Sequence, residues 1–344
     1  MIATRIELAP GALGDPAALL PEHGNAFLLT DDHVEPLLPA ELLRLPHLVL
    51  PPGESSKSWQ QLGAILLALD ETRIDRDGHL LAVGGGVVTD IGGLAASLHR
   101  RGIAWTAVPT TLIGQVDAAI GGKTAVDLGG GKNTVGSFHP PEHVIVDPGA
   151  LASLPERELR AGMAEVLKSA LVAGPELLAA VEELDPQDFA AGTPPAIEAI
   201  MACVRTKERL VAEDLLDHGV RRHLNLGHTF GHAFEALAAP ALVHGEAVGL
   251  GLLCAARLAG MQPDGDPALE TRLRALLERW GLPVTTAAAP DRVLAEMGRD
   301  KKRRAGRQVF VLAVAPGRIE VIEDPEQTAV TAALDAVSHA ASTS

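Results

Sequence analysis

The feature that most constrains the fold of this chain is a change in hydrophobic pattern near residue 150. Before that point, short apolar runs alternate with amphipathic segments, as in α/β units that build a parallel sheet. From residue 151 the apolar residues recur at helical spacing, and strand-like sequence returns only at 307–323. The pattern predicts an α/β nucleotide-binding domain over residues 1–150 and a mainly α-helical domain over residues 151–344. We expect the functional site in a cleft between them.

The same pattern predicts the individual elements. In the first domain we expect strands at 26–32, 47–53, 79–88, 103–111 and 143–149, and helices at 55–71 and 89–101. The helix at 55–71 has a serine available as its N-cap. In the second domain we expect helices at 154–174, 194–216, 245–260 and 267–281.

The charge balance is acidic, with 44 Asp and Glu against 29 Lys and Arg and a net charge of −15. This argues against a nucleic-acid partner, which requires a basic surface, although a local cluster of cations can still bind a small anion. The two cysteines lack metal-site or disulfide-framework spacing. With no apolar signal core and no run long enough to span a membrane, we expect a cytoplasmic protein without a membrane partner.

Tyrosine is absent from the chain. Any proton transfer must therefore use His, Lys, carboxylates, a metal-bound oxygen or the substrate itself.

Three histidines lie close together in the segments LNLGHTFGHAFE (224–235) and VHGEAV (243–248). His228 and His232 are four residues apart, so both rings project from one face of a helix, and His244 follows at the start of the next helix. Converging imidazoles with a carboxylate from elsewhere form a divalent-metal site with an open position. The plainer alternative is a set of structural histidines. The pattern is not that of zinc proteases, because Thr229 replaces their glutamate.

Two glycine-rich segments are candidates for binding anions. GGGVVTD (84–90) lies between a predicted strand and helix, where backbone N–H groups could approach a pyrophosphate, but Thr89 breaks the usual dinucleotide pattern. GGKTAVDLGGGKN (121–133) fails as a phosphate-binding P-loop because Asp117 replaces its first glycine. We interpret it as a glycine-rich loop whose lysines bind phosphate or carboxylate. A tight turn and a solvated loop are the alternatives.

A helical turn, AGMAEVLK (161–168), places Glu165 and Lys168 on one face. Glu165 could be the metal carboxylate and Lys168 could hold a substrate hydroxyl, whereas an ordinary surface ion pair is the alternative. The segments CVRTK (203–207), RRHLN (221–225) and RDKKRR (299–304) supply further cations, although charge runs are often only solvated.

Taken in order, these segments resemble the 3-dehydroquinate synthase family of sugar-phosphate cyclases. The similar segments are PPGESSKS, GGGVVTD, RRG, VPTTL, QVDAAIGGKTAVD, GKN, FHPP, LPERELRAGMAEVLK, CVRTK, LNLGHTFGHAFE, HGEAV and RDKK, which together span residues 51–302.

The resemblance implies NAD and one divalent metal ion, zinc or cobalt, with Glu165, His228 and His244 as metal ligands. His232 would then contact substrate phosphate or transfer a proton, whereas spacing alone left it a candidate ligand. The other implied catalytic residues are Lys168, Asp217 and Asp117. The implied NAD contacts are Asp31, Glu54, Lys57, Gly85, Gly86, Val87, Asp90, Thr110, Thr111 and Lys132. The implied substrate contacts are Arg101, Lys123, Asn133, Lys207, Arg221, Asn225 and Lys301.

The implied reaction converts 3-deoxy-D-arabino-heptulosonate 7-phosphate, a small anionic sugar-acid phosphate, to 3-dehydroquinate. The steps are transient oxidation by NAD, phosphate elimination, re-reduction and an intramolecular aldol closure. Arg101 resembles an arginine that reaches the neighbouring subunit's site, so a homodimer is implied. Pro140 and Asp217 depart from the family pattern. A cyclase for an amino analogue or a phosphate without the carboxylate, a metal-dependent polyol dehydrogenase and a non-catalytic ligand sensor remain as alternatives.

Overall fold

The computed structural model describes residues 4–21, 25–129, 131–238, 241–303 and 307–338, with the backbone alone described for 300–303. The chain divides into two compact units. Unit 1 is Met1–Pro155 with Phe189–Val204, and unit 2 is Glu156–Asp188 with Arg205–Ser344. Helices α6 (Pro186–Ala191) and α7 (Pro194–Glu213) each contain a division between the units. The sequence placed everything after residue 150 in one domain, whereas residues 189–204 group with unit 1.

Unit 1 is built on a parallel sheet in the order β1-β8-β5-β4-β2-β3. Its strands are β1 (Arg5–Leu8), β2 (Ala26–Asp31), β3 (His47–Leu50), β4 (His79–Gly84), β5 (Ala104–Pro109) and β8 (His143–Val146). Because β2 leads to β3 on one side while β4 leads to β5 on the other, β2 and β4 flank the point where the winding direction reverses. In sheets of this kind, ligands bind at the carboxyl ends of the strands at that point.

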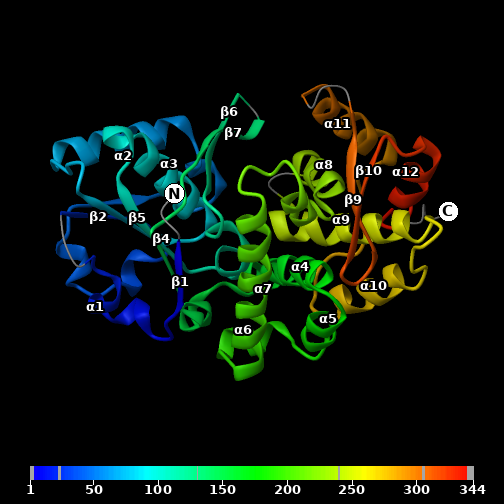
Figure 1. Ribbon diagram of the computed structural model, residues 1–344, viewed down its shortest axis with the longest axis horizontal. Helices are drawn as coiled ribbons and strands as arrows, with labels where there is room; N and C mark the ends of the chain where they lie inside the picture. Colours follow the sequence, from blue (N-terminus) through cyan, green and yellow to red (C-terminus); the bar gives the residue numbers. More distant parts are fainter. Residues whose placement is uncertain (1–3, 22–24, 130, 239–240, 304–306, 339–344) are drawn as a thin grey trace. The chain divides into compact units, whose positions relative to one another are not determined.

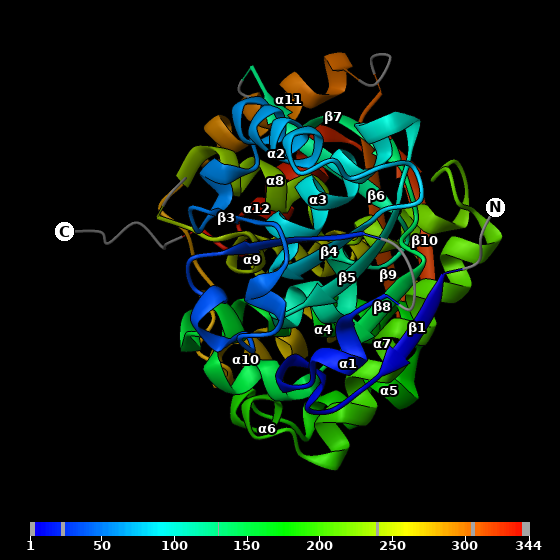
Figure 2. The ribbon, with the colours of Figure 1, turned by 90° about the vertical axis from the view of Figure 1, so that its left-hand side faces the viewer.

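Helices cover both faces of this sheet. Figures 1 and 2 show α2 (Trp59–Glu71) and α3 (Gly86–Leu98) on one face and α1 (Pro16–Leu19) on the other. Alternate residues of β4 separate the two faces: Leu81 and Val83 join the apolar core on the α1 side, whereas Ala82 lies against Gly92 of α3. The predicted helix at 55–71 begins later, at Trp59, and a serine is its N-cap: the side chain of Ser58 accepts the N–H of Gln61.

The prediction of a glycine-rich loop at 121–133 is wrong. The segment enters an antiparallel hairpin of β6 (Lys123–Leu128) and β7 (Gly131–Phe138), paired from Lys123 with Phe138 to Leu128 with Gly131. Along β6, Thr124 and Val126 are buried while Lys123 and Leu128 are exposed. This two-residue alternation is the pattern of a strand with one buried face. The sequence prediction gave more weight to the glycines, which are typical of loops.

Unit 2 is organised around α9 (His244–Ala259), which is buried along almost its whole length. The helices α4 (Glu156–Ala173), α8 (His228–Ala238), α10 (Leu269–Arg279) and α12 (Gln327–Leu334) pack on it, together with β9 (Val309–Ala315). The unit also contains α5 (Pro175–Glu182), α11 (Pro290–Arg303) and β10 (Arg318–Glu323), which pairs with β9. Small residues along α9 allow its neighbours to approach closely. A Cβ at Gly251, for example, would lie 2.1 Å from the carbonyl oxygen of Gly227.

Candidate active site

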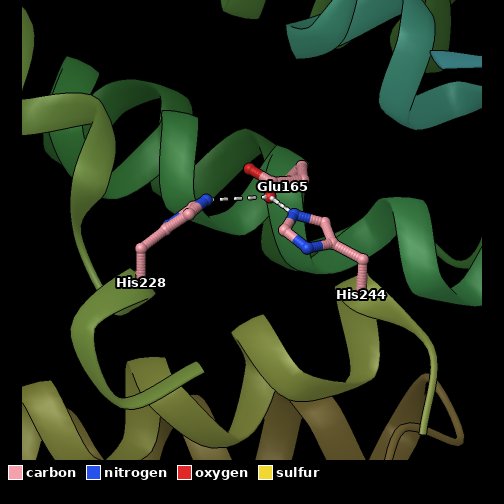
Figure 3. Close-up of side chains that lie close together, drawn as sticks. All are labelled: Glu165, His228 and His244. Atoms are coloured by element: carbon pink, nitrogen blue, oxygen red, sulfur yellow. Dashed lines mark hydrogen bonds and ion pairs between the residues drawn. The ribbon is translucent and has the colours of Figure 1, made fainter. Parts of the chain in front are cut away.

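Glu165, His228 and His244 converge in unit 2 from three different helices. Glu165 lies in α4, His228 is the first residue of α8 and His244 is the first residue of α9. Figure 3 shows both imidazoles pointing at the carboxylate of Glu165. The Nε2 atoms of His244 and His228 lie 3.2 Å and 3.6 Å from the same oxygen, Oε1 of Glu165. The Glu165 side chain is fully buried.

These distances fit one divalent cation. Zinc bonds of roughly 2.1 Å in a tetrahedron place two ligand atoms about 3.4 Å apart. The two observed separations of 3.2 Å and 3.6 Å bracket that value, and all three ligand atoms lie within 4.8 Å of one another. One carboxylate and two imidazoles fill three positions, which is the arrangement of catalytic sites that keep one position for water or substrate.

Hydrogen-bond partners on the far side of each ring fix its orientation. Nδ1 of His228 lies 3.1 Å from the carbonyl oxygen of Leu226, and Nδ1 of His244 lies 3.4 Å from the Glu235 carboxylate. Each ring therefore turns its Nε2 atom toward Glu165. Histidines that ligate metals characteristically donate their second N–H to a carbonyl or carboxylate in this way. Sequence reasoning missed Glu235, although it follows His232 by three residues on the same helix.

The pKa values of the two histidines are shifted in opposite directions. Burial and the nearby Lys168 lower the pKa of His228 to about 3, so its imidazole is neutral. Burial also disfavours the charged form of His244, but its contacts with Glu165 and Glu235 outweigh burial and raise its pKa to about 10. Without a metal ion, His244 therefore occupies the position of a cation between two carboxylates.

The second carboxylate oxygen of Glu165 is held by Lys168. The Nζ atom of Lys168 lies 2.5 Å from Oε2 of Glu165, and both side chains are buried. The alternative of a surface ion pair is therefore wrong. With Oε2 held by Lys168, Oε1 is the oxygen that faces the two histidines.

His232 lies beside this group but is not one of the three converging ligands. Its ring centroid is 5.2 Å from that of His228 and 6.3 Å from that of His244, and its side chain is exposed. An exposed imidazole at the edge of the group suits contact with substrate or proton transfer better than metal binding.

Three further residues named from the sequence lie near one another along unit 2. The short helical segment Val220–Asn225, which packs on α4, begins just after Asp217 and contains Arg221 and Asn225. Arg221 is buried and donates from Nη1 to the carbonyl of Leu215 at 2.6 Å. Asp217 has a φ of +61°, which is strained for a residue with a side chain.

Two more cations named from the sequence belong to unit 2. Lys207, in α7, is buried. The backbone of Lys301 belongs to α11, while its side chain lies outside the described part of the structure.

In unit 1, residues named as NAD contacts follow the carboxyl ends of neighbouring strands. Asp31 ends β2, Gly85 and Gly86 follow β4, and Thr110 and Thr111 follow β5. They therefore share the edge at which ligands of such sheets bind. Helix α3 begins at Gly86, earlier than the predicted residue 89, so Gly86 and Val87 form its first turn. A Cβ on Gly85 would lie 2.9 Å from the Thr111 methyl group, so the glycine permits this close packing.

Other predicted NAD contacts in unit 1 form ion pairs. Lys57 is buried against Asp90 of α3; burial opposes its charge, but Asp90 and Glu54 raise its pKa. Lys132 of the β6–β7 hairpin lies 3.6 Å from Glu54. In the same hairpin, the Asn133 N–H donates to Asp127 at 2.6 Å.

The remaining predicted residues of unit 1 are spread over three segments. Lys123, which is exposed, begins β6. Asp117 lies in a π-helical turn, Gly114–Ala118, and such turns are frequent at functional sites. Arg101 is exposed and has a φ of +69°.

None of the helices in the described part of the chain is long and apolar enough to cross a membrane.

Comparison with known proteins adds independent information. The family model of the 3-dehydroquinate synthase N-terminal region matches residues 47–161, and that of the C-terminal region matches residues 162–303. The chain is 41% identical to the 3-dehydroquinate synthase of Rhodospirillum rubrum, covering 96% of this chain and 91% of the relative. It is also 41% identical to that of Xanthomonas campestris pv. campestris, covering 94% and 93%.

A solved structure is also similar. The 2-epi-5-epi-valiolone synthase of Streptomyces hygroscopicus subsp. jinggangensis, solved with NAD+ and Zn2+ bound, is 32% identical with a TM-score of 0.87. The match covers 97% of this chain and 96% of that one.

Proposed function

The chain belongs to the 3-dehydroquinate synthase family, and we propose that it converts 3-deoxy-D-arabino-heptulosonate 7-phosphate to 3-dehydroquinate and phosphate. This is a step of the shikimate pathway toward aromatic amino acids. The observation that carries the proposal is the convergence of Glu165, His228 and His244, each imidazole oriented by a partner on its far side. Oxidation and re-reduction cancel, so the products are phosphate and a closed ring.

The described residues suit both cofactors. Glu165, His228 and His244 would hold a zinc or cobalt ion, and the carboxyl edge of the sheet in unit 1 would hold NAD, with pyrophosphate near the first turn of α3. When bound, these groups supply a Lewis acid and a reversible hydride acceptor. The relative bound to NAD+ and Zn2+ supports this assignment.

Lys168 and His232 are the proposed residues for handling protons and hydroxyls in unit 2. Lys168 is buried beside Glu165, where its ammonium group can donate to a substrate hydroxyl while it holds the carboxylate. His232 is exposed at the edge of the ligand group, within reach of a substrate phosphate or of a proton on its way to solvent. Asp117 and Asp217 are proposed as the catalytic carboxylates.

The buried cations of unit 2 support an anionic substrate. Lys168, Lys207 and Arg221 are all buried in a chain whose net charge is −15. Charge interactions are weakly screened in a buried region, so these cations would attract an anionic ligand that reaches them. We assign Lys207 and Arg221 to the substrate carboxylate. We assign Lys123, Asn133, Asn225 and Lys301 to further substrate contacts.

The proposed assembly is a homodimer in the cytoplasm. Arg100, Arg101 and Gly102 have φ values of +50°, +69° and +115° in succession. Residues with side chains adopt this conformation at a cost and often at functional sites, where the strain fixes a side chain in place. Here it presents the exposed Arg101, which we propose reaches the substrate in the partner subunit.

A sister cyclase is the second candidate. The 32% identical 2-epi-5-epi-valiolone synthase shows that the same fold serves a differently named cyclase. The higher identity to relatives named 3-dehydroquinate synthase favours the first proposal. A polyol dehydrogenase is disfavoured because it would not need the buried cations that we assign to the anionic substrate.

The test is phosphate release from 3-deoxy-D-arabino-heptulosonate 7-phosphate with NAD and zinc present. We expect phosphate to appear without net NADH, and EDTA to stop its release. A matched seven-carbon phosphate lacking the carboxylate should react poorly. Preference for that analogue would favour the sister cyclase, and net NADH would favour a dehydrogenase. No phosphate release with metal bound would refute the proposal.

A further inference from the structure

Two residues close in sequence to the proposed metal ligands have no role in the proposal so far: Arg157, in the segment LPERELR, and Glu246, in the segment HGEAV. We propose that Arg157 is a positioning residue for the metal ligand His244. It holds the start of α9 against α4, and thereby fixes the distance from His244 to Glu165. The inference rests on the proposed metal site and assigns to it a residue outside the ligand set.

Arg157 connects α4 to the chain on both sides of His244. Its Nε and Nη2 atoms donate to the two oxygens of Glu246, each at 2.8 Å, so the pair is bidentate. Nη2 also donates to the carbonyl oxygen of Ala241 at 2.6 Å. Bidentate pairs of arginine and carboxylate fix relative orientation as well as distance. One guanidinium therefore holds the segment before His244 and the first turn after it.

Glu246 also defines where α9 begins. Its Oε2 atom accepts the N–H of Val243 at 3.1 Å, which satisfies a backbone donor just before the helix. His244 is the next residue, and its backbone direction is set by the start of the helix. The hydrogen bonds of Arg157 thus act on the residue that determines where the His244 side chain begins.

The first turn of α9 lies directly on the backbone of α4. A Cβ at Gly245 would lie only 2.0 Å from the carbonyl oxygen of Ala161, one helical turn before Glu165. The ion pair of Arg157 lies two turns before Glu165 on the same helix. Two contacts along α4 therefore hold the α9 start in register with the metal carboxylate.

Because Arg157 is exposed, its loss should affect metal binding and the stability of the fold to different extents. The Arg157 side chain is 53% exposed and that of Glu246 is 12% exposed. An ion pair with an exposed partner contributes little to folding, whereas metal ligands tolerate displacements of only about 0.5 Å. Loss of Arg157 should therefore weaken metal binding far more than it weakens the fold.

The experiment compares Arg157→Gln with the matched control Arg160→Gln. Arg160 lies on the same helix and pairs with Glu156 rather than with the α9 start. Zinc affinity is measured by competition with a chromophoric chelator, and stability by thermal melting of the metal-free proteins. We expect Arg157→Gln to lower zinc affinity by roughly 10–100-fold, the usual effect of losing an outer partner of a ligand. The control should bind zinc as the wild type does, and both metal-free variants should melt near the wild type.

Two further variants sharpen the result. Arg157→Lys keeps the charge but cannot form the bidentate pair, so it should also lose affinity. If Arg157→Gln fails to fold, Glu246→Gln replaces it, because the amide oxygen can still accept the Val243 N–H while the ion pair is lost. Unchanged zinc affinity in a folded Arg157→Gln or Glu246→Gln variant would overturn the positioning role alone. A wild-type chain that takes up no zinc would overturn the proposed function as well.

Discussion

Replacing Gly245 with alanine should separate two helices at the point where the proposed metal ligands meet. The added Cβ would lie 2.0 Å from the carbonyl oxygen of Ala161 and 2.5 Å from its carbonyl carbon. These are backbone atoms of α4 that no side-chain rotation can move. Such contacts essentially never fall below 3.0 Å, so the start of α9 must move away by about 1 Å.

The size of the effect follows from the ligand distances. His244 precedes Gly245 and its Nε2 lies 3.2 Å from Glu165 Oε1. A shift of about 1 Å would carry this separation beyond the roughly 3.4 Å that a tetrahedral zinc ion requires. Zinc affinity should fall by about 100-fold, the upper end of the effects seen for misplaced ligands. Overpacking should cost the fold about 1–3 kcal/mol.

Gly249→Ala is the matched control, one turn further along α9. A Cβ there would meet its nearest atom, on Leu277, at 3.6 Å, which is ordinary van der Waals contact. Alanine at this position should be neutral or stabilise by up to about 1 kcal/mol through helix propensity. Thermal melts with and without zinc measure both effects, because zinc raises the melting temperature only where it binds. A Gly245→Ala variant with the wild-type zinc-induced shift would show that α4 and α9 do not set the ligand geometry.

Three other outcomes follow from the structure. His244→Ala should abolish metal retention, whereas His232→Ala should keep the metal and lose turnover; equal metal loss in the purified variants would contradict the ligand assignment. Because the pKa of His244 is about 10 and that of His228 about 3 without metal, each zinc ion bound at pH 8 should release about one proton, measured by calorimetry in two buffers of different protonation enthalpy; no release would contradict the charge state of His244. Burial lowers the pKa of His79 from 6.5 to about 4, so between these pH values the unfolded chain binds a proton that the folded chain does not. The free energy of unfolding should therefore fall by about 3 kcal/mol as the pH drops from 6.5 to 4. The His79→Gln variant should lose less stability on acidification than the wild type, and equal acid sensitivity would count against this cause.

The central sheet of unit 1 could be predicted because its strands are short apolar runs ended by glycine, proline or acidic residues. The predicted strands at 26–32 and 79–88 correspond to β2 and β4, although β4 ends at Gly84 and residues 86–88 belong to α3. A serine caps α2 as predicted, but the helix begins at Trp59 rather than at residue 55. Strand β1 was not predicted because none of its four residues is fully buried, so its sequence lacks the apolar run typical of a buried strand. The β6–β7 hairpin was obscured by the glycines of 121–133. Gly121 and Gly122 precede β6 with φ values of +93° and +67°, and Gly129, with a φ of +61°, lies between the two strands, so these glycines serve the turns of a hairpin.

The sequence indicated a metal site but could not choose its ligands from spacing. His228 and His232 share one helix face, and nothing local distinguishes them. The choice is made by tertiary structure, since His228, the first residue of α8, is the histidine of this helix whose ring nitrogen converges with Glu165 and His244. The resemblance to a known family gave the same ligand set. Glu235 was missed because its partner, His244, lies on another helix.

The different surroundings of the two histidines have a consequence for the charge of the site. His228 faces a backbone carbonyl and stays neutral, while His244 lies between two carboxylates and carries a proton in the absence of metal. With Lys168 beside Glu165, the metal-free group has two positive and two negative charges. Exchange of one proton for a dication would leave a net charge of about +1 in a buried region, where charge interactions are weakly screened. The loaded group would thus provide a local excess of positive charge in an acidic chain, which would favour negative charge on a substrate oxygen.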